Sequence, residues 1–235
     1  MTRQDPATRA PPRVYPDLAH ECALWAAGYR VVAGIDEVGR GALAGPVMAA
    51  AVVLPPDPSA LAHLLGQVDD SKRLPAGARE HLDHAIRACA LAAGVGSVRA
   101  EEIDRIGIVP ATRLAMALAL DALTPCLAPD YLLIDFLTLP SLPGPQLGLP
   151  HGDALSLSIA AASIVAKVAR DAWMAAQDAV FGGYGFAAHK GYGTPAHQEA
   201  LARLGPCPLH RRSFEPLRGL PVETAATLAK PVCTG

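Results

Sequence analysis

Two adjacent carboxylates, Asp36 and Glu37, stand at the end of an apolar, β-branched segment that predicts a strand over residues 30–36. Burying charge at such a place is costly without a partner, and a divalent cation is a partner that keeps both carboxylates ionised. Because successive strand residues point to opposite faces, we expect the strand to end or kink here if both side chains bind one ion. On local sequence alone, a solvated turn explains the pair equally well.

Two further carboxylates occupy comparable places. Asp135 ends the short apolar run 131–135, a predicted strand, and Asp153 begins a long alanine-rich helix predicted from residue 153 to about 179. Ligands in α/β proteins gather at the carboxyl ends of strands. Taken singly, Asp135 is more readily a turn residue and Asp153 a helix N-cap. Taken together, the four carboxylates could surround a pair of divalent cations, which prefer oxygen ligands.

Glycines follow the first carboxylate pair closely, in the order Gly39-Arg40-Gly41, with Gly45 further on. This spacing is one residue too long for a dinucleotide-binding fingerprint, and Pro46 begins a second predicted strand where that fold requires a helix. The sequence also lacks a P-loop and the Gly-x-Ser-x-Gly motif of a serine hydrolase. The carboxylates are therefore the main candidates for chemistry.

The elements that must position these residues alternate between strand and helix, which favours an α/β layer architecture. Helical spacing places Leu114, Leu118 and Ala122 on one side of a helix, and Gly94 should end another helix. Proline and glycine predict loops over residues 139–150 and 181–194. Further helices are predicted at residues 20–27, 75–93, 110–123 and 195–204, and further strands at 46–54 and 95–98.

Composition bounds the class of protein. Of the 235 residues, 51% are hydrophobic, which is enough for one sizeable core and excludes a disordered chain. The net charge of −2 provides no general attraction to nucleic acid, so any phosphate contacts must come from a local basic cluster. The candidates for such a cluster are Arg40, Lys72, Arg73, Lys167, Arg170, Lys190, Arg211 and Arg212.

The cysteines and the apolar segments bear on the cellular compartment. The five cysteines are scattered and form no Cys-x-x-Cys pair, and Cys207 with His210 lacks the second pair that would complete a zinc site, so neither a disulfide framework nor a zinc site is indicated. No segment has the pattern of a signal peptide or the uninterrupted apolar length of a membrane span. We therefore expect a cytoplasmic protein without a membrane segment.

Longer motifs give a stronger indication of family. In order and spacing, a set of segments between residues 30 and 216 resembles the bacterial ribonuclease HII family. The resemblance implies an α/β, RNase H-like fold, a mixed central sheet flanked by helices, with a small C-terminal helical lobe. The segments that carry it are 32–54, Asp70-Ser71-Lys72, 101–104, 111–113, Gly152-Asp153-Ala154, 156–171, 184–186, His189-Lys190-Gly191-Tyr192-Gly193-Thr194 and His210-Arg211-Arg212-Ser213-Phe214.

The resemblance also implies a division of the chain. Residues 17–180 are expected to form the catalytic domain and residues 181–220 a helical and loop lobe that binds substrate. Residues 1–16 are expected to be a flexible arm, and residues 221–235 a flexible tail. The expected oligomeric state is a monomer.

Residue roles follow from the same resemblance. The family's catalytic, metal-binding carboxylates fall on Asp36, Glu37, Asp135 and Asp153, with two Mg²⁺ or Mn²⁺ ions as cofactors. The implied substrates are RNA–DNA hybrids and duplex DNA containing ribonucleotides, cut on the 5′ side of the ribonucleotide during ribonucleotide excision and replication-associated RNA removal. By the same resemblance, Gly39, Arg40 and Gly41 sense the ribonucleotide and Tyr192 packs on the ribose. Substrate contacts are also expected for Ser71, Lys72, His189, Lys190, Arg211 and Arg212, although a solvated surface charge would explain each basic residue taken alone.

Three positions depart from the family pattern. Phe136 follows the third carboxylate where a glycine or small residue is usual, His151 replaces a lysine, and Asp69 replaces an asparagine. We expect the two polar changes to tune affinity or pH dependence. Two alternatives remain open: another two-metal nuclease of the same fold, and a hybrid-binding module that has lost its chemistry.

Overall fold

A mixed five-stranded sheet forms the centre of the computed structural model, which describes residues 15–68, 71, 74–123 and 127–219. The spatial order is β3-β2-β1-β4-β5; β1 pairs antiparallel with β2 and parallel with β4. The tail expected at 221–235, and all but residues 15 and 16 of the expected arm, lie outside the described residues. The strands are β1 (Val32–Val38), β2 (Val47–Val53), β3 (Ala92–Val98), β4 (Tyr131–Asp135) and β5 (Gln146–Leu149).

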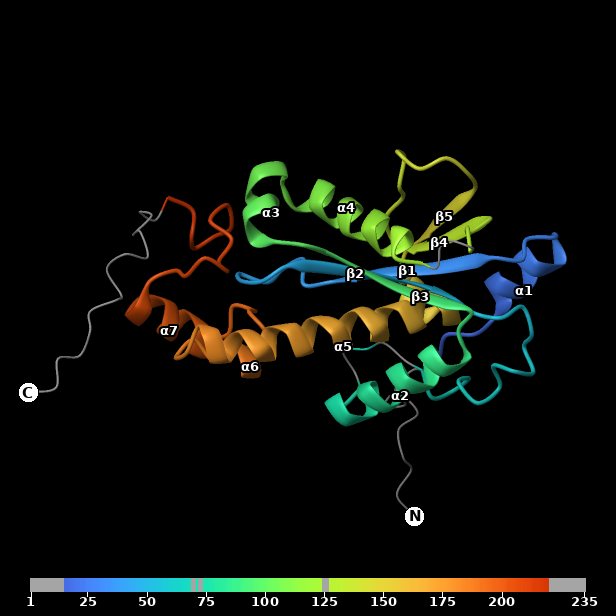
Figure 1. The fold of residues 1–235 in the computed structure, drawn as a ribbon, viewed down its shortest axis with the longest axis horizontal. Coiled ribbons are helices and arrows are strands. Elements are labelled where there is room, and N and C mark those ends of the chain that lie inside the picture. Colours follow the sequence, from blue (N-terminus) through green and yellow to red (C-terminus); the bar gives the residue numbers. More distant parts are fainter. Residues whose placement is uncertain (1–14, 69–70, 72–73, 124–126, 220–235) are drawn as a thin grey trace, which may run out of the picture.

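Helices cover both faces of this sheet (Figure 1), as the predicted α/β layer architecture requires. They are α1 (Ala19–Ala26), α2 (Ala76–Cys89), α3 (Ala100–Ile106), α4 (Ile108–Asp121), the short 3₁₀ helix η2 (Gly152–Ala154), α5 (Leu157–Val180), α6 (Phe186–His189) and α7 (Pro195–Leu204). The β5 strand replaces part of the loop expected at 139–150, and α6 part of the loop expected at 181–194. None of the helices described is long and apolar enough to cross a membrane.

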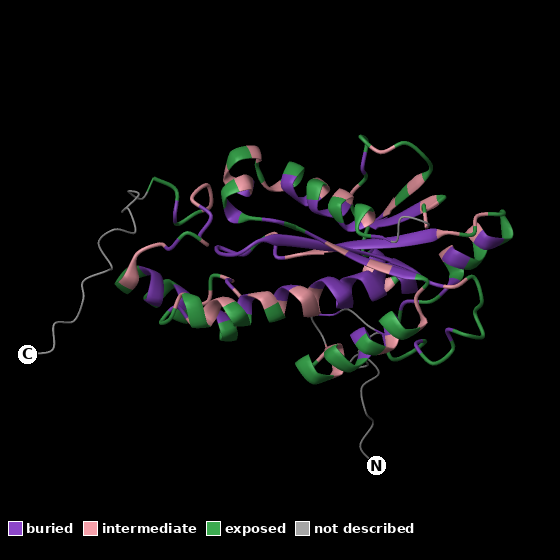
Figure 2. Ribbon diagram, viewed as in Figure 1, coloured by how far each residue is buried: buried purple, intermediate pink, exposed green. Residues whose placement is uncertain are grey.

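The central strand β2 explains why the fold has two helical layers. All seven of its residues are buried, so each face must be covered. Ala49 and Ala51 belong to the apolar cluster that includes α4, and Ala50 and Val52 to the cluster that includes α5. Figure 2 shows the resulting pattern, with buried central strands, a partly exposed edge strand β5 and helices whose outer sides are exposed.

The packing of α4 on β3 differs from the sequence prediction. Leu114 and Leu118 were expected on the buried side, but they are 38% and 39% exposed. The buried side carries small residues instead, because α4 lies almost in contact with the backbone of β3. A Cβ atom at Gly94 would come 2.2 Å from the carbonyl oxygen of Ala119. Gly94 therefore permits this close approach inside a strand and does not end α2, which stops at Cys89.

The start of α5 also differs from the prediction. Asp153 lies in the η2 turn and is not the N-cap of the long helix. The N-cap is Ser156, whose hydroxyl accepts a hydrogen bond from the Ile159 amide at 3.3 Å. The three-residue turn thus frees Asp153 from capping and leaves its carboxylate available to the neighbouring strands.

The chain beyond α5 packs around the C-terminal end of that helix, where Figure 1 shows α6 and α7. Phe186 is fully buried and lies against the rings of three histidines. His197 Nε2 lies 3.1 Å from His210 Nε2, and the rings of His189 and His197 stack with their centroids 4.2 Å apart. This aromatic cluster anchors the segment that carries Tyr192, because His197 Nδ1 lies 2.9 Å from the Tyr192 carbonyl oxygen.

Candidate active site and metal centre

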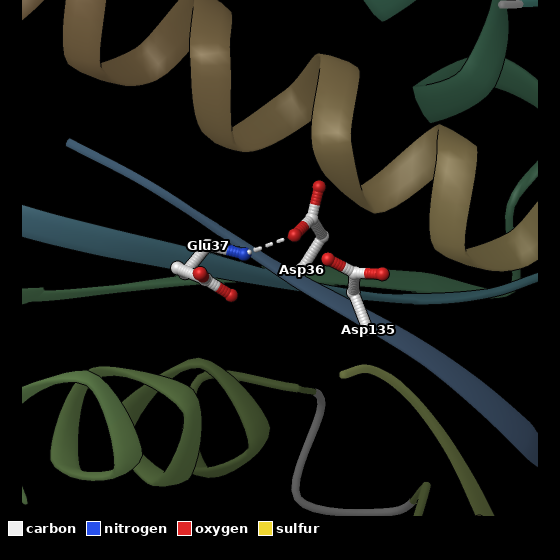
Figure 3. A group of neighbouring side chains, drawn as sticks. All are labelled: Asp36, Glu37 and Asp135. Carbon is white, nitrogen blue, oxygen red and sulfur yellow. Dashed lines mark hydrogen bonds between the residues drawn. The ribbon is translucent and has the colours of Figure 1, made fainter. Parts of the chain in front are cut away.

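Three carboxylates meet where β1 and β4 stop pairing. Ligand oxygens of Asp36, Glu37 and Asp135 lie within 4.8 Å of one another (Figure 3). We had expected the strand to end or kink at Asp36 and Glu37. Instead, β1 continues through both residues and stays paired with β2. The ladder between β1 and β4 stops at Ile35 and Ile134, so the edge of β1 beyond Ile35 is open. Side chains from either face can therefore approach each other at this edge.

The electrostatics of Asp36 favour the binding of a cation. Burial raises the pKa of Asp36 well above its usual value, and the neighbouring carboxylates of Glu37 and Asp135 raise it further. A hydrogen bond from the Ser163 hydroxyl on α5 lowers the pKa, without cancelling these effects. The side chain is only 5% exposed, and its Oδ1 accepts the Glu37 amide at 2.7 Å. This charge is poorly compensated by the protein alone.

The charge of the Glu37 carboxylate is also incompletely compensated. Burial raises its pKa, and the Arg40 guanidinium, at 3.2 Å from Oε1, acts in the opposite direction. Its other oxygen, Oε2, is buried and has no hydrogen-bond partner among the described residues. A buried carboxylate oxygen without a partner is costly, and a bound cation would remove that cost.

The remaining two carboxylates are linked through the η2 turn. The Gly152 amide donates to Asp135 Oδ1 at 2.7 Å, which fixes the turn against the end of β4. Asp153, in the same turn, is close enough to raise the pKa of Asp36. The site thus combines three clustered carboxylates, Asp153 nearby but outside the cluster, and a buried oxygen without a partner among the described residues. This set of oxygen donors fits hard divalent cations.

The Gly39-Arg40-Gly41 loop is held from behind by a buried arginine. Arg211 is fully buried and donates to the carbonyls of Gly39, Arg40 and Gly45 at 2.7, 2.8 and 3.0 Å. Burial and the nearby Arg170 lower the pKa of Arg211 to about 9, which leaves the guanidinium charged at neutral pH. In this conformation Arg211 shapes the loop and does not face a phosphate.

The two glycines of this loop have different surroundings. Gly39 has a φ of 87°, and a Cβ there would come 2.2 Å from Arg170 Nε, so only glycine fits. Gly41 is exposed, and an added Cβ would meet nothing within 4 Å. The backbone at Gly41 is therefore open to a ligand, close to the Arg40–Glu37 pair.

Arg170 was a candidate for the basic cluster, and its part as a structural anchor was not predicted. It is fully buried and donates to the carbonyls of Ala44, Pro46 and Lys190. It therefore joins α5 both to the chain before β2 and to the C-terminal segment. Lys167, three residues before Arg170 on the same helix, forms an ion pair with Asp171 at 2.7 Å.

Tyr192 lies beside this anchor. Its half-buried ring is 5.4 Å from the Arg170 guanidinium carbon and 5.8 Å from Lys167 Nζ. Lys190 is half-buried, with a φ of 53° at the end of α6. His189 uses both ring nitrogens within the protein, on the Tyr184 carbonyl and the Gly191 amide. His189 is thus a structural neighbour of the Tyr192 segment.

The structure gives Ser71 a place behind the metal ligands. Its buried hydroxyl is 2.9 Å from that of Ser163, the residue whose hydroxyl bonds Asp36. Sequence reasoning did not single out Ser163; the only signal was a serine within the buried side of an alanine-rich helix. Lys72 and Asp69 lie outside the described residues. Arg212 donates its amide to Asp104 and its guanidinium to the Pro206 carbonyl.

Two of the departures from the family pattern share a backbone feature. Phe136 and His151 both have a φ of 57°, a left-handed conformation that disfavours side chains. This conformation explains why glycine is usual after the third carboxylate. The Phe136 ring is 65% exposed, so its bulk points into solvent instead of displacing Asp135.

Comparisons with known proteins agree with this arrangement. Residues 33–216 match the family model described as Ribonuclease HII. The Ribonuclease HII of Chloroflexus aurantiacus is 57% identical over 202 residues, covering 86% of this chain and 94% of that protein. That of Geobacillus kaustophilus is 55% identical over 201 residues, covering 86% and 74%. The crystal structure of ribonuclease H2 from Pyrococcus horikoshii superposes with a TM-score of 0.65 at 27% identity, covering 80% of this chain and 95% of that one.

The match spans most of the chain and contains the carboxylate cluster, the glycine loop and Tyr192. The fold is accordingly RNase H-like, and the enzyme class is that of a hydrolase acting as an endoribonuclease on RNA–DNA hybrids. The chain belongs to the ribonuclease HII family.

Proposed function

We propose that this enzyme incises duplex DNA on the 5′ side of an embedded ribonucleotide, in addition to cutting the RNA strand of hybrids, with two Mg²⁺ or Mn²⁺ ions. Its cellular roles would be ribonucleotide excision and replication-associated RNA removal. The observation that carries the proposal is the carboxylate cluster at the open edge of β1, next to the exposed backbone of Gly41.

Each carboxylate has a distinct part in holding the cations. Asp36 supplies a buried carboxylate next to two others, and Glu37 supplies Oε2, which has no hydrogen-bond partner among the described residues. Asp135 and Asp153 would complete the set from β4 and η2. Divalent cations bound there would lower the pKa of the attacking water and stabilise the leaving oxygen. Gly152 holds Asp135 in place through its amide, and Ser163 holds Asp36.

Discrimination of RNA from DNA depends on the 2′-hydroxyl. The Gly41 backbone is open and can offer an amide or a carbonyl to this group, because Arg211 and Arg170 hold the loop from the buried side. Tyr192 would present its ring to the sugar, and the charged groups of Lys167 and Arg170 lie beside that ring. Arg40, partly exposed, is available to a neighbouring phosphate.

The test is cleavage of a labelled duplex DNA that contains one ribonucleotide, with Mg²⁺, Mn²⁺ or EDTA. We expect metal-dependent incision that leaves a 3′-hydroxyl and a 5′-phosphate, with the ribonucleotide at the 5′ end of the downstream fragment. An all-DNA duplex of the same sequence should stay intact, and Asp36→Asn should abolish incision of the duplex that contains the ribonucleotide. The asparagine keeps an oxygen for the Glu37 amide, so folding is preserved.

Other outcomes point to the alternatives. Tight binding of the ribonucleotide duplex without incision in any metal would identify a binding module. Equal cutting of the all-DNA duplex would identify another nuclease of the same fold. Absence of both binding and incision would contradict the proposal entirely.

A further inference from the structure

A buried glutamate outside the family-matched region contacts the start of the helix behind the metal centre. Glu21 lies on α1, is 1% exposed, and precedes the matched residues 33–216. Its Oε1 accepts three hydrogen bonds, from the Ser156 hydroxyl at 2.6 Å and from the Ser158 amide and hydroxyl at 2.9 and 2.6 Å. A carboxylate at this place also faces the positive end of the 24-residue helix α5.

The chain before α1 reinforces this contact. The Leu157 amide donates to the Asp17 carbonyl at 2.8 Å, and Asp17 forms an isolated parallel bridge with Ser156. One turn after Glu21, the Trp25 side chain is buried in the apolar cluster that includes α5. Residues 17–25 therefore contact the start of α5 through backbone hydrogen bonds, side-chain hydrogen bonds and apolar packing.

The first turn of α5 is in turn bonded to the carboxylates. The Ser156 amide donates to the Gly152 carbonyl at 2.9 Å, and the Gly152 amide donates to Asp135 at 2.7 Å. On the other side, β1 lies directly against this turn, since a Cβ at Gly34 would come 2.2 Å from the Ser158 carbonyl carbon. Gly34 is two residues before Asp36 on the same strand.

We propose that Glu21 is a positioning residue for the metal centre. By fixing the first turn of α5, it sets where η2 and the end of β4 stand relative to β1, and so the spacing of Asp36, Asp135 and Asp153. Outer-shell groups of this kind change metal affinity by about 10–100-fold when removed. The inference rests on the proposed metal centre.

The competing explanation is that Glu21 only anchors α1. Trp25→Leu provides the matched control, because Trp25 holds the same helix to the same cluster without bonding Ser156 or Ser158. Glu21→Ala removes all three hydrogen bonds to α5, and Glu21→Asp keeps the charge but ends one methylene short of Ser158. Both kinds of variant should lower the midpoint of urea unfolding in EDTA.

The discriminating measurement is calorimetric titration of each folded variant with Mn²⁺. We expect Glu21→Ala to bind Mn²⁺ at least about tenfold more weakly than the wild type and Glu21→Asp to be weakened in the same direction, with Trp25→Leu within about twofold of the wild type. If Glu21→Ala does not fold, Glu21→Asp decides.

The inference would be overturned if Glu21→Ala, or Glu21→Asp where Glu21→Ala does not fold, bound Mn²⁺ as tightly as the wild type. It would also be overturned if Trp25→Leu weakened Mn²⁺ binding equally at the same loss of stability. Failure of the wild type itself to bind Mn²⁺ would instead count against the proposed metal centre.

Discussion

Replacing Asp36 with asparagine should stabilise the metal-free protein while removing its activity. Oxygens of Asp36, Glu37 and Asp135 lie within 4.8 Å of one another. Two unit charges at that separation repel by about 3.5 kcal/mol at an effective dielectric constant of about 20. Asp36 escapes part of this cost by taking up a proton, since its pKa is raised by burial and by its neighbours.

The stability that the metal-free protein gains from Asp36→Asn depends on pH. A carboxyl whose pKa is raised in the folded state contributes stability at low pH that is lost as the pH rises through the folded-state pKa. We therefore expect Asp36→Asn to be about as stable as the wild type near pH 4, and about 1–3 kcal/mol more stable at pH 8 in EDTA. For a chain of this length, that gain corresponds to a rise in melting temperature of roughly 3–10 °C.

The assay is thermal unfolding of both proteins in EDTA across this pH range, repeated with saturating Mn²⁺. Added Mn²⁺ should raise the melting temperature of the wild type and have little effect on the variant, because only the protein that binds the ion gains stability. The reasoning would be refuted if the variant melted at or below the wild type in EDTA at pH 8, or if the difference did not change with pH.

Three further predictions concern residues around the site. Burial lowers the pKa of His197 and lowers that of His210 to about 4. The free energy of unfolding should therefore fall by roughly 2–3 kcal/mol as the pH drops from about 6.5 toward 4. Urea unfolding at a series of pH values measures this dependence, which should be weaker in His210→Gln. Arg211→Lys should cost about 2–4 kcal/mol and reduce cleavage below its melting temperature, because a lysine cannot serve three buried carbonyls; unchanged stability by urea unfolding would contradict this. Phe136→Gly should stabilise the protein by up to about 1 kcal/mol by relieving the left-handed conformation, and a loss of stability in the same assay would show that the exposed ring contributes more than expected.

The sheet and its carboxylates could be predicted because their signals are local. The β-branched run before Asp36 and the apolar run before Asp135 each identify a strand, and each strand ends near a charge that needs a partner. The helix predicted at residues 195–204 is likewise confirmed, since α7 begins at Pro195 and ends at Leu204.

Packing decided the features that the sequence did not predict. Hydrophobicity alone favoured Leu114 and Leu118 for the buried side of α4, but the glycines of β3 bring the helix so close that only small residues fit there. Arg170 was a candidate for a basic cluster, yet it is buried because three carbonyls from other segments converge on it. Two of these carbonyls, on Ala44 and Pro46, belong to residues more than a hundred positions away, so the contact leaves no local pattern in the sequence.

The central claim is that the carboxylates at the open edge of β1 bind catalytic divalent cations. Calorimetric titration of the wild type with Mn²⁺ in buffers of different ionisation enthalpy tests it most directly. Because burial and neighbouring charge raise the pKa of Asp36 and burial raises that of Glu37, binding should release protons, increasingly as the pH falls from 8 to 6. Asp36→Asn should lose most of the affinity and part of the proton release. Equal Mn²⁺ affinity in the two proteins, or binding by the wild type without proton release, would contradict the account.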